Sequence, residues 1–393
     1  MKDKKKIAVE FIILFGIISA LGDVTYEGAR SVYGTYLASL GATATIIGFI
    51  TGLGEFLGYT FRLISGYFVD KTGMDWPITI LGYTLLLSVP LLGFSNTWKV
   101  AAIFVLCERL GKAIRSPGKS SMLSHATKHV GTGFGFGILE AVDQLGALIG
   151  PLVFTFALTL TGTYKAGFKF MLIPALLTIA FVIFARIRVP NPKELEEDIK
   201  TEKKIDIKNN KALYTEKFIN YSLFIFFSIV GFVNFPILSY HFLNKKIILE
   251  GVIPTLYAVA MALDGLFALI IGKYYDKKGF KALMFVPILS VALVILGFSK
   301  NMYFAIVSVM LWGIVMSIHE TILKAAIADI TTKDIRGRAY GIFYTIYGIS
   351  MLIGSVIMGY LYEVSTLSII MFSAICQLVA FIFYFKFKRS LQK

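Results

Sequence analysis

Asp23, Glu27 and Arg30 interrupt an apolar stretch, 7–38, near the start of the chain. Their spacing of four and three residues places all three on one stripe of a helix. A carboxylate in apolar surroundings binds or releases a proton according to its burial and its neighbouring charges. The spacing therefore predicts a helix face that can bind a proton or a charged ligand.

A second apolar stretch, 98–124, carries a cluster of charged residues on one side of the predicted helix: Glu108, Arg109, Lys112, Arg115 and Lys119. A charge in hydrocarbon is costly unless it is paired, hydrated or used. For Arg115 and Lys119, a structural ion pair explains the charge as well as a function does. Two further acids lie in the stretch 134–161, so the predicted site for binding and proton coupling extends to Glu108, Arg109, Lys112, Glu140 and Asp143.

The second half of the chain carries fewer charged residues within its apolar stretches. His319 lies deep within the stretch 302–328, and Glu320 follows it directly. Because imidazole titrates near neutral pH, both residues are candidates for contact with a proton or a substrate. A structural ion pair or a helix end is the alternative for Lys324 and Asp329.

These residues lie on stretches long enough to cross about 30 Å of hydrocarbon as helices of roughly 20 residues. The stretches are 7–38, 43–69, 77–95, 98–124, 134–161, 166–187, 218–243, 250–275, 281–299, 302–328, 338–363 and 366–386. A long polar segment, 188–217, separates the first six stretches from the last six and is expected to be a solvated linker. The sequence thus predicts an all-α membrane protein with twelve transmembrane helices, in two six-helix domains at 1–187 and 218–393.

The distribution of basic residues predicts the orientation of these spans. When Lys and Arg are counted in alternate loops, 25 lie on the side of both termini and the linker, against 6 on the other side. Short loops rich in Lys and Arg stay in the cytoplasm, so we expect both termini and the linker there, in a multi-pass protein of the cell membrane. The third, sixth, ninth and twelfth stretches have no charge in their cores and are expected to face lipid.

Composition excludes several classes of protein. With 56% hydrophobic and 16% charged residues, the chain has too little polar surface for a soluble protein. The net charge of +15 lies in short clusters without a basic face, so no nucleic-acid partner is expected. Cys107 and Cys376 lie far apart in apolar stretches, and neither a phosphate-binding loop nor a nucleophile elbow is intact. We therefore expect no metal, no cofactor, no ATP-driven step and no enzyme.

A short motif, G-x-x-x-D-K-x-G, occurs twice, 206 residues apart, and each copy ends an apolar stretch. The copies are Gly66, Asp70, Lys71, Gly73 and Gly272, Asp276, Lys277, Gly279. A repeat of half the chain length indicates two copies of one structural unit. We expect both Asp residues in tight turns that act as gates, with Arg336 and Arg338 as partners for Asp70. The alternative is a turn with a helix cap and no gating role.

Glycines in the stretch 134–161 form a second pattern. Asp143, Gly146 and Gly150 share one helix face, and Pro151 follows. Such a face allows another helix to approach closely, so it is either a packing surface or a gating element that prevents leak. Gly150 aligns with Gly354 at an offset of 204, which indicates that the repeat extends beyond the loops.

These motifs resemble those of the major facilitator superfamily over essentially the whole chain. The doubled motif matches the loop motif of that superfamily, and Arg109 stands where its membrane-buried arginine is expected. The run Gly137, Gly146, Gly150, Pro151 is similar to a motif of drug/proton antiporters, although Phe154 and Thr155 replace its last two glycines. Lys112 and Ala113 likewise replace the residues that usually follow the arginine.

The resemblance implies a secondary active transporter that works by alternating access in the lipid bilayer, as a monomer. The expected activity is proton-coupled export of a small organic compound or drug. Proton-coupled uptake of a polar or anionic metabolite is the alternative, because the charges in the first and fourth stretches suit such a substrate. A membrane receptor without transport activity, or a lipid scramblase, is an alternative of another class.

Overall fold

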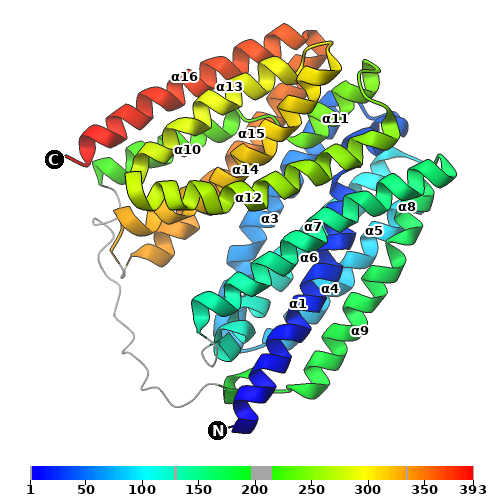
Figure 1. Ribbon diagram of the computed structural model, residues 1–393, viewed down its shortest axis with the longest axis vertical. Helices are drawn as coiled ribbons and strands as arrows, with labels where there is room; N and C mark the ends of the chain where they lie inside the picture. Colours follow the sequence, from blue (N-terminus) through cyan, green and yellow to red (C-terminus); the bar gives the residue numbers. More distant parts are fainter. Residues whose placement is uncertain (1, 128–130, 196–214, 333–334, 393) are drawn as a thin grey trace. The chain divides into compact units, whose positions relative to one another are not determined.

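The computed structural model describes residues 2–127, 131–195, 215–332 and 335–392 (Figure 1). These residues form α-helices and short 3₁₀ helices, and no β-strand occurs among them. The packing of the helices divides the chain into two compact units. The first unit holds Met1–Val32 and Leu57–Lys203, and the second holds Tyr33–Phe56 and Lys204–Lys393.

The first unit is built from helices of the first half of the chain. They are α1 (Lys2–Arg30), the later part of α3 (Ala44–Thr72), α4 (Asp75–Thr84), η1 (Leu85–Leu87), α5 (Ser88–Leu91), η2 (Leu92–Phe94), α6 (Trp98–Thr127), α7 (Thr132–Thr161), α8 (Tyr164–Phe170), α9 (Leu172–Arg188) and η3 (Pro192–Leu195). Most of the predicted linker, 196–214, lies outside the described residues.

The second unit contains α2 and the start of α3 from the first half of the chain, together with the helices of the second half. They are α2 (Tyr33–Ser39), α10 (Glu216–Val230), α11 (Phe235–Asn244), η5 (Glu250–Val252), α12 (Ile253–Lys278), η6 (Gly279–Met284), α13 (Phe285–Gly297), α14 (Met302–Ile330), α15 (Arg336–Val364) and α16 (Thr366–Ser390). In this division by packing, Tyr33–Phe56 belongs with the second half of the chain. The domain boundaries predicted from the sequence, 1–187 and 218–393, therefore stay a prediction.

The all-α membrane fold is confirmed, and the helices follow the predicted stretches. In the described part of the chain, 10 segments are long and apolar enough to cross a membrane. Two features account for the difference from twelve. The segment Glu250–Gly297 contains two of the predicted spans and is counted once. Helix α6 is present but is not counted, because its charged residues from Glu108 to Lys119 make it too polar.

Several predicted spans are divided into shorter helices, and two of the interruptions separate pairs of α-helices in equivalent halves of the chain, at the first and the seventh span. The first span is interrupted at Ser31 and Val32, between α1 and α2. The seventh is interrupted between α10 and α11, where the Asn234 side chain caps α11 by accepting a hydrogen bond from the Ile237 N–H at 3.1 Å. Asn favours such a cap, because its side-chain oxygen replaces a helical acceptor. Apolarity alone does not reveal these interruptions.

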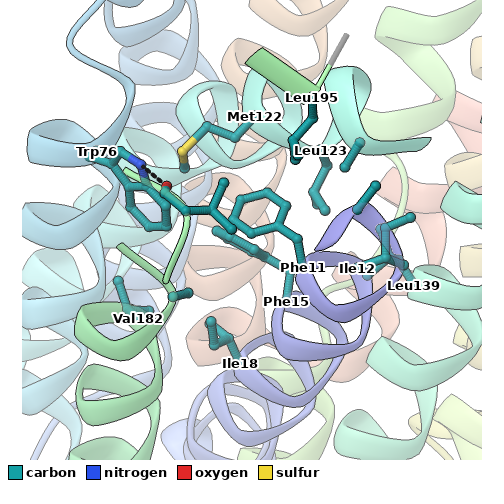
Figure 2. Packing of buried hydrophobic residues seen from close by; sticks show 14 of the residues in the cluster. Phe11, Ile12, Phe15, Ile18, Trp76, Met122, Leu123, Leu139, Val182 and Leu195 are labelled. Carbon is teal, nitrogen blue, oxygen red and sulfur yellow. Dashed lines mark hydrogen bonds between the residues drawn. The ribbon is translucent and has the colours of Figure 1, made fainter. Parts of the chain in front are cut away.

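An apolar cluster in the first unit joins α1, α4, α6, α9 and η3 (Figure 2). Phe15 contacts Phe11 with ring centroids 4.8 Å apart, and both rings pack near Trp76. The indole N–H of Trp76 donates to the Val189 carbonyl at 3.1 Å, and Leu195 is buried in the same cluster. The beginning of the predicted linker is therefore anchored to the helices that precede it.

The glycine face of α7 packs against α1. A Cβ atom at Gly146 would overlap the Ala20 carbonyl, and one at Gly150 would overlap the Val24 carbonyl and the backbone of Gly28. Only glycine allows this approach, which explains the predicted face as a packing surface. Of the spans predicted to face lipid, the sixth and twelfth have only 28% of their apolar segments buried, whereas the third has 50%.

A seam of small and polar residues joins the start of α3 to α15 within the second unit. A Cβ at Gly48 would overlap the Ser355 carbonyl, and one at Gly359 would crowd the backbone of Ala44 and Thr45. The Thr45 N–H donates to Glu363 Oε1 at 2.9 Å. The seam therefore combines close backbone packing with a few hydrogen bonds.

Replacing Gly48 with Leu should prevent this packing, because the added side chain would occupy the space of the Ser355 carbonyl. Cysteines placed at Thr45 and Glu363 should form a disulfide efficiently in the parent protein and several-fold less in Gly48→Leu. Gly58→Leu is a matched control on the same helix, because a Cβ there has no neighbour within 4 Å. Equal cross-linking in both variants would contradict the described seam.

Candidate functional site

Charged side chains of α1 and α6 form a cluster inside the first unit. The Glu27 carboxylate lies 3.6 Å from Arg30 and 3.8 Å from Lys112. Arg109 donates a hydrogen bond to the Tyr26 hydroxyl. The two helices are therefore joined by charged side chains, with one acid held between two bases.

Tyr26 lies at the centre of this cluster. It is 1% exposed, and the Lys112 ammonium is 3.8 Å from its ring centroid, with the Arg109 guanidinium at 5.0 Å and Arg30 at 5.8 Å. Cations are attracted to the negative face of an aromatic ring. The ring thus lies among three cations and helps to hold them close together.

Glu108 occupies a different environment on the inner side of α6. Its side chain is 0% exposed, and the nearest cation is Arg109, whose Nε lies 3.8 Å from Oε2. Within the described residues, neither carboxylate oxygen accepts a hydrogen bond. A buried carboxylate is costly in its charged form unless hydrogen bonds or a nearby cation compensate.

The other end of α6 carries an ion pair that fits a structural role. Lys119 Nζ lies 3.3 Å from Asp143 Oδ2 on α7 and also donates to the Ser19 hydroxyl on α1. The Arg115 guanidinium lies 4.9 Å from the ring centroid of Tyr83. These contacts tie α6 to its neighbours and explain two of the predicted charges by packing.

Two of the predicted site residues lie outside the contacts described around Tyr26. Asp23 is half-buried beside Gly146, and no hydrogen bond or ion pair of its side chain occurs in the described part of the chain. Glu140 is exposed. The structure therefore brings Glu27 and Arg30 together with α6, while Asp23 lies one helical turn away.

His319 and Glu320 lie in different environments despite being adjacent in sequence. His319 is 1% exposed, its Nδ1 is 3.4 Å from the Tyr347 hydroxyl, and its ring is 4.8 Å from the ring centroid of Phe232. Glu320 is exposed, since neighbouring residues on a helix point in different directions. Trp312 also stacks near Phe232, so the surroundings of His319 are aromatic rather than charged.

The duplicated motif marks two helix ends. Gly73 and Gly279 have φ values of +66° and +57° and follow the last residues of α3 and α12. Asp70 and Asp276 are exposed in the last turns of these helices, so the expectation of Asp residues within the turns themselves needs correction. The glycines end the helices because a left-handed conformation costs them nothing.

Arg336, a predicted gate partner, has a local contact at the start of α15. Its Nη2 donates to the Ala328 carbonyl at 2.9 Å, near the end of α14. A cation at a helix C-terminus is favourable, because the carbonyl groups there carry partial negative charge. This contact accounts for Arg336 within the second unit alone.

Sequence reasoning did not find several contacts of these groups. Ser19, Phe232 and Trp312 carry no charge and lie in apolar stretches, so nothing in the local pattern distinguishes them. The repeat offset of 206 aligns Tyr26 with Phe232 and could have suggested that both line equivalent positions. The described residues contain no group of three or more His, Cys, Asp or Glu side chains that could hold a metal ion.

Comparison with known proteins agrees with this architecture. The family model of the Major Facilitator Superfamily matches residues 12–250 and 248–393. An uncharacterized protein of Mycobacterium tuberculosis is 36% identical over 384 residues, covering 96% of this chain and 93% of the relative. An uncharacterized MFS-type transporter of Methanocaldococcus jannaschii is 30% identical over 366 residues, covering 90% and 89%. The chain therefore belongs to the major facilitator superfamily of membrane transporters.

Two further similarities are more distant. The class H tetracycline resistance protein of Pasteurella multocida is 27% identical over 157 residues, which is 38% of this chain and 39% of that protein. The crystal structure of the nucleoside transporter NupG has a TM-score of 0.73 at 14% identity, covering 96% of this chain and 99% of the other. At that identity the structural likeness supports the fold alone.

A double-mutant cycle on Glu27 and Lys112 should show that this pair, in which Glu27 is buried and Lys112 is partly buried, is coupled. Glu27→Gln, Lys112→Met and the double variant should give an interaction free energy of about 2 kcal/mol in unfolding experiments on detergent-solubilised protein, since neighbouring charges in one network couple by about 0.5–3 kcal/mol. The exposed pair Glu10 and Arg188, 3.4 Å apart, is the matched control and should give less than about 1 kcal/mol. Equal coupling in both cycles would argue against a buried network.

Proposed function

We propose that this protein is a proton-coupled secondary transporter that exports a small organic compound in exchange for protons. The observation that carries the proposal is the buried carboxylate of Glu108 on α6, which lies beside Arg109 and accepts no hydrogen bond from the residues that the structure describes. Such a carboxyl group can hold a proton in one state of the transport cycle and pair with Arg109 in another. The partial similarity to a tetracycline resistance protein supports export.

Uptake of a polar or anionic metabolite is the second candidate, and the charged cluster of α1 and α6 supports it. Arg30, Arg109 and Lys112 surround Tyr26, and the Glu27 carboxylate lies 3.8 Å from Lys112. An anionic substrate could take the place of that acid as the partner of Lys112. The two candidates differ in the direction of proton flow relative to substrate.

Alternating access requires parts of the protein that can separate and close again. We place one of them at the seam of α3 and α15, where hydrogen bonds and glycine contacts alternate along the helices. The duplicated motif supplies further candidates, because an Asp in the last turn of a helix is opposed by the helix dipole and must gain stability elsewhere. We further propose that the protein works as a monomer in the cell membrane, with both termini and the linker in the cytoplasm.

The direction of coupling can be tested in proteoliposomes. A substrate is first selected by a thermal-shift screen of the purified protein against metabolites and drugs, tetracycline included. An acidic interior should then drive accumulation if protons and substrate are exchanged, because protons leave as the substrate enters. Accumulation driven only by an acidic exterior would support uptake together with protons. Transport at the same rate with either pH gradient and without one would contradict proton coupling.

The coupling residues can be tested in the same vesicles. Glu108→Gln should reduce gradient-driven accumulation at least about tenfold, because the amide cannot carry the proton, while exchange of substrate without a gradient should persist. Glu27→Gln and Asp23→Asn should show the same separation if the α1 stripe takes part. Glu10→Gln is the control, since Glu10 is exposed on α1 and pairs with Arg188. An unchanged pH dependence in Glu108→Gln would assign coupling to another residue.

The gating role of the motif can be tested by an effect that differs from the effect of the same substitution on the stability of the helix. Asp70→Asn removes a negative charge from the C-terminal turn of α3, which should slightly stabilise the helix itself. If Asp70 instead stabilises one conformation through a partner, the variant should shift the conformational equilibrium by about 1–3 kcal/mol. Distance measurements between spin labels report the populations, with the exposed Glu194→Gln as control. Unchanged populations in both Asp70→Asn and Asp276→Asn would reduce the motif to a helix end.

A further inference from the structure

A cavity of about 320 Å³ lies in the first unit, and none of its lining residues belongs to the α1–α6 cluster. It is bordered by the turn after α3, the start of α4, α6, and the segment that follows α9. Its polar lining residues are Asp75, His125, Arg186, Asn191 and Lys193. The volume lies within the range of sites that bind small molecules, about 300–1,000 Å³.

The walls of this cavity are fixed by the apolar cluster beneath them. Trp76 and Met122 line the cavity and are also buried in that cluster (Figure 2). The hydrogen bond from Trp76 to the Val189 carbonyl holds the chain just after α9, and the buried Leu195 holds η3. Pro190 and Pro192 restrict the backbone between these two anchors. Lys193 is therefore carried by an ordered segment.

The cationic groups of the cavity are placed to receive an anion. Neither Arg186 nor Lys193 has an ion-pair partner among the residues that the structure describes, whereas the nearby Arg188 pairs with Glu10 at 3.4 Å. Lys193 Nζ lies 3.4 Å from the position that a Cβ of Gly73 would occupy. No side chain caps the start of α4, whose first N–H groups favour negative charge.

Asp75 indicates that a ligand of this cavity also carries a hydrogen-bond donor. It is only 8% exposed, it lines the cavity, and its Oδ1 is buried with no hydrogen-bond partner in the described part of the chain. A buried acceptor without a donor destabilises the protein, so a bound molecule that supplies a donor would satisfy it. A plain anion would instead be repelled by this carboxylate.

We propose that this cavity binds a small organic phosphate that carries a hydroxyl or ammonium group. Arg186 and Lys193 contact the phosphate oxygens, and Asp75 accepts a hydrogen bond from the donor group. The ligand connects Lys193, at the start of the predicted linker, to the turn at Gly73 in the first copy of the duplicated motif. The same chemistry occurs in soluble phosphate esters and in lipid headgroups, and both sources fit these groups.

Binding can be measured by equilibrium dialysis of the purified full-length protein against radiolabelled glycerol 3-phosphate. We expect saturable binding of one molecule per chain. Arg186→Gln and Lys193→Gln should each weaken it at least about tenfold, because each removes a charge-assisted hydrogen bond. Arg188→Gln should bind like the parent protein. Thermal unfolding of each variant shows that it is folded. Absence of saturable binding, or equal weakening by Arg188→Gln, would overturn the proposal.

The role of Asp75 is tested by a ratio of affinities. The parent protein should bind glycerol 3-phosphate at least about tenfold more tightly than methyl phosphate, which has no donor group. Asp75→Asn should reduce this preference, and the ratio cancels the general effect of removing a negative charge. An unchanged preference in Asp75→Asn, or none in the parent protein, would refute the assignment of Asp75.

The source of the ligand is distinguished in lipid nanodiscs. In phosphatidylcholine nanodiscs, glycerol 3-phosphate should bind as it does in detergent. If phosphatidylglycerol nanodiscs abolish this binding in the parent protein, the lipid headgroup occupies the cavity. If binding is equal in both lipids, the ligand is a soluble phosphate ester. Failure to bind in detergent and in phosphatidylcholine alike would contradict the site for either source.

Discussion

The cost of placing charge in an apolar interior determines how the first unit is built. Helix α6 carries so many charged residues that it is not apolar enough to count as a membrane span by composition. Its charges are accommodated by particular partners on α1 and α7, namely Glu27, Tyr26, Ser19 and Asp143. A lone buried charge is far more costly than a paired one, so α6 depends on these helices for its position.

The two halves share a scaffold but differ in the chemistry that they place on it. Gly150 lies against the Val24 carbonyl, and Gly354 lies against the Val230 carbonyl, so the repeat seen in the sequence is also a repeat of contacts. At the positions related by this repeat, Tyr26 is surrounded by cations, whereas Phe232 is surrounded by aromatic rings and His319. Close helix packing is therefore common to both halves, while the buried ion pairs described here belong to the first. This difference concentrates the candidate proton and ligand chemistry on α1 and α6.

The sequence predicts those features that depend on composition along one helix. The apolar stretches, the end of α3 at Gly73 and the pairing of Glu27 with α6 all follow from spacing and from the cost of charge. The interruption at Ser31 and Val32 does not, because neither residue is a strong helix breaker. The separation of His319 from Glu320 likewise depends on which side of α14 is covered. The grouping of Tyr33–Phe56 with the second unit rests on distant contacts that no local pattern encodes.

The nature of the helix contacts suggests where a conformational change costs least. The α1–α7 contact buries glycines against backbone, and Lys119 with Asp143 adds a partly buried ion pair, so opening it would expose groups that water replaces poorly. The seam of α3 and α15 also packs glycines against backbone, but its polar contacts are hydrogen bonds. Asn234 Nδ2 donates to Thr51 Oγ1 at 2.9 Å and to Ser355 Oγ at 2.8 Å, and the bond between Thr45 and Glu363 is exposed. Hydrogen bonds between neutral groups, such as those of Asn234, contribute only about 0.5–1.5 kcal/mol each, because water can replace the lost partner. A seam held by such bonds can open once water reaches it, whereas the α1–α7 contact keeps the first unit intact.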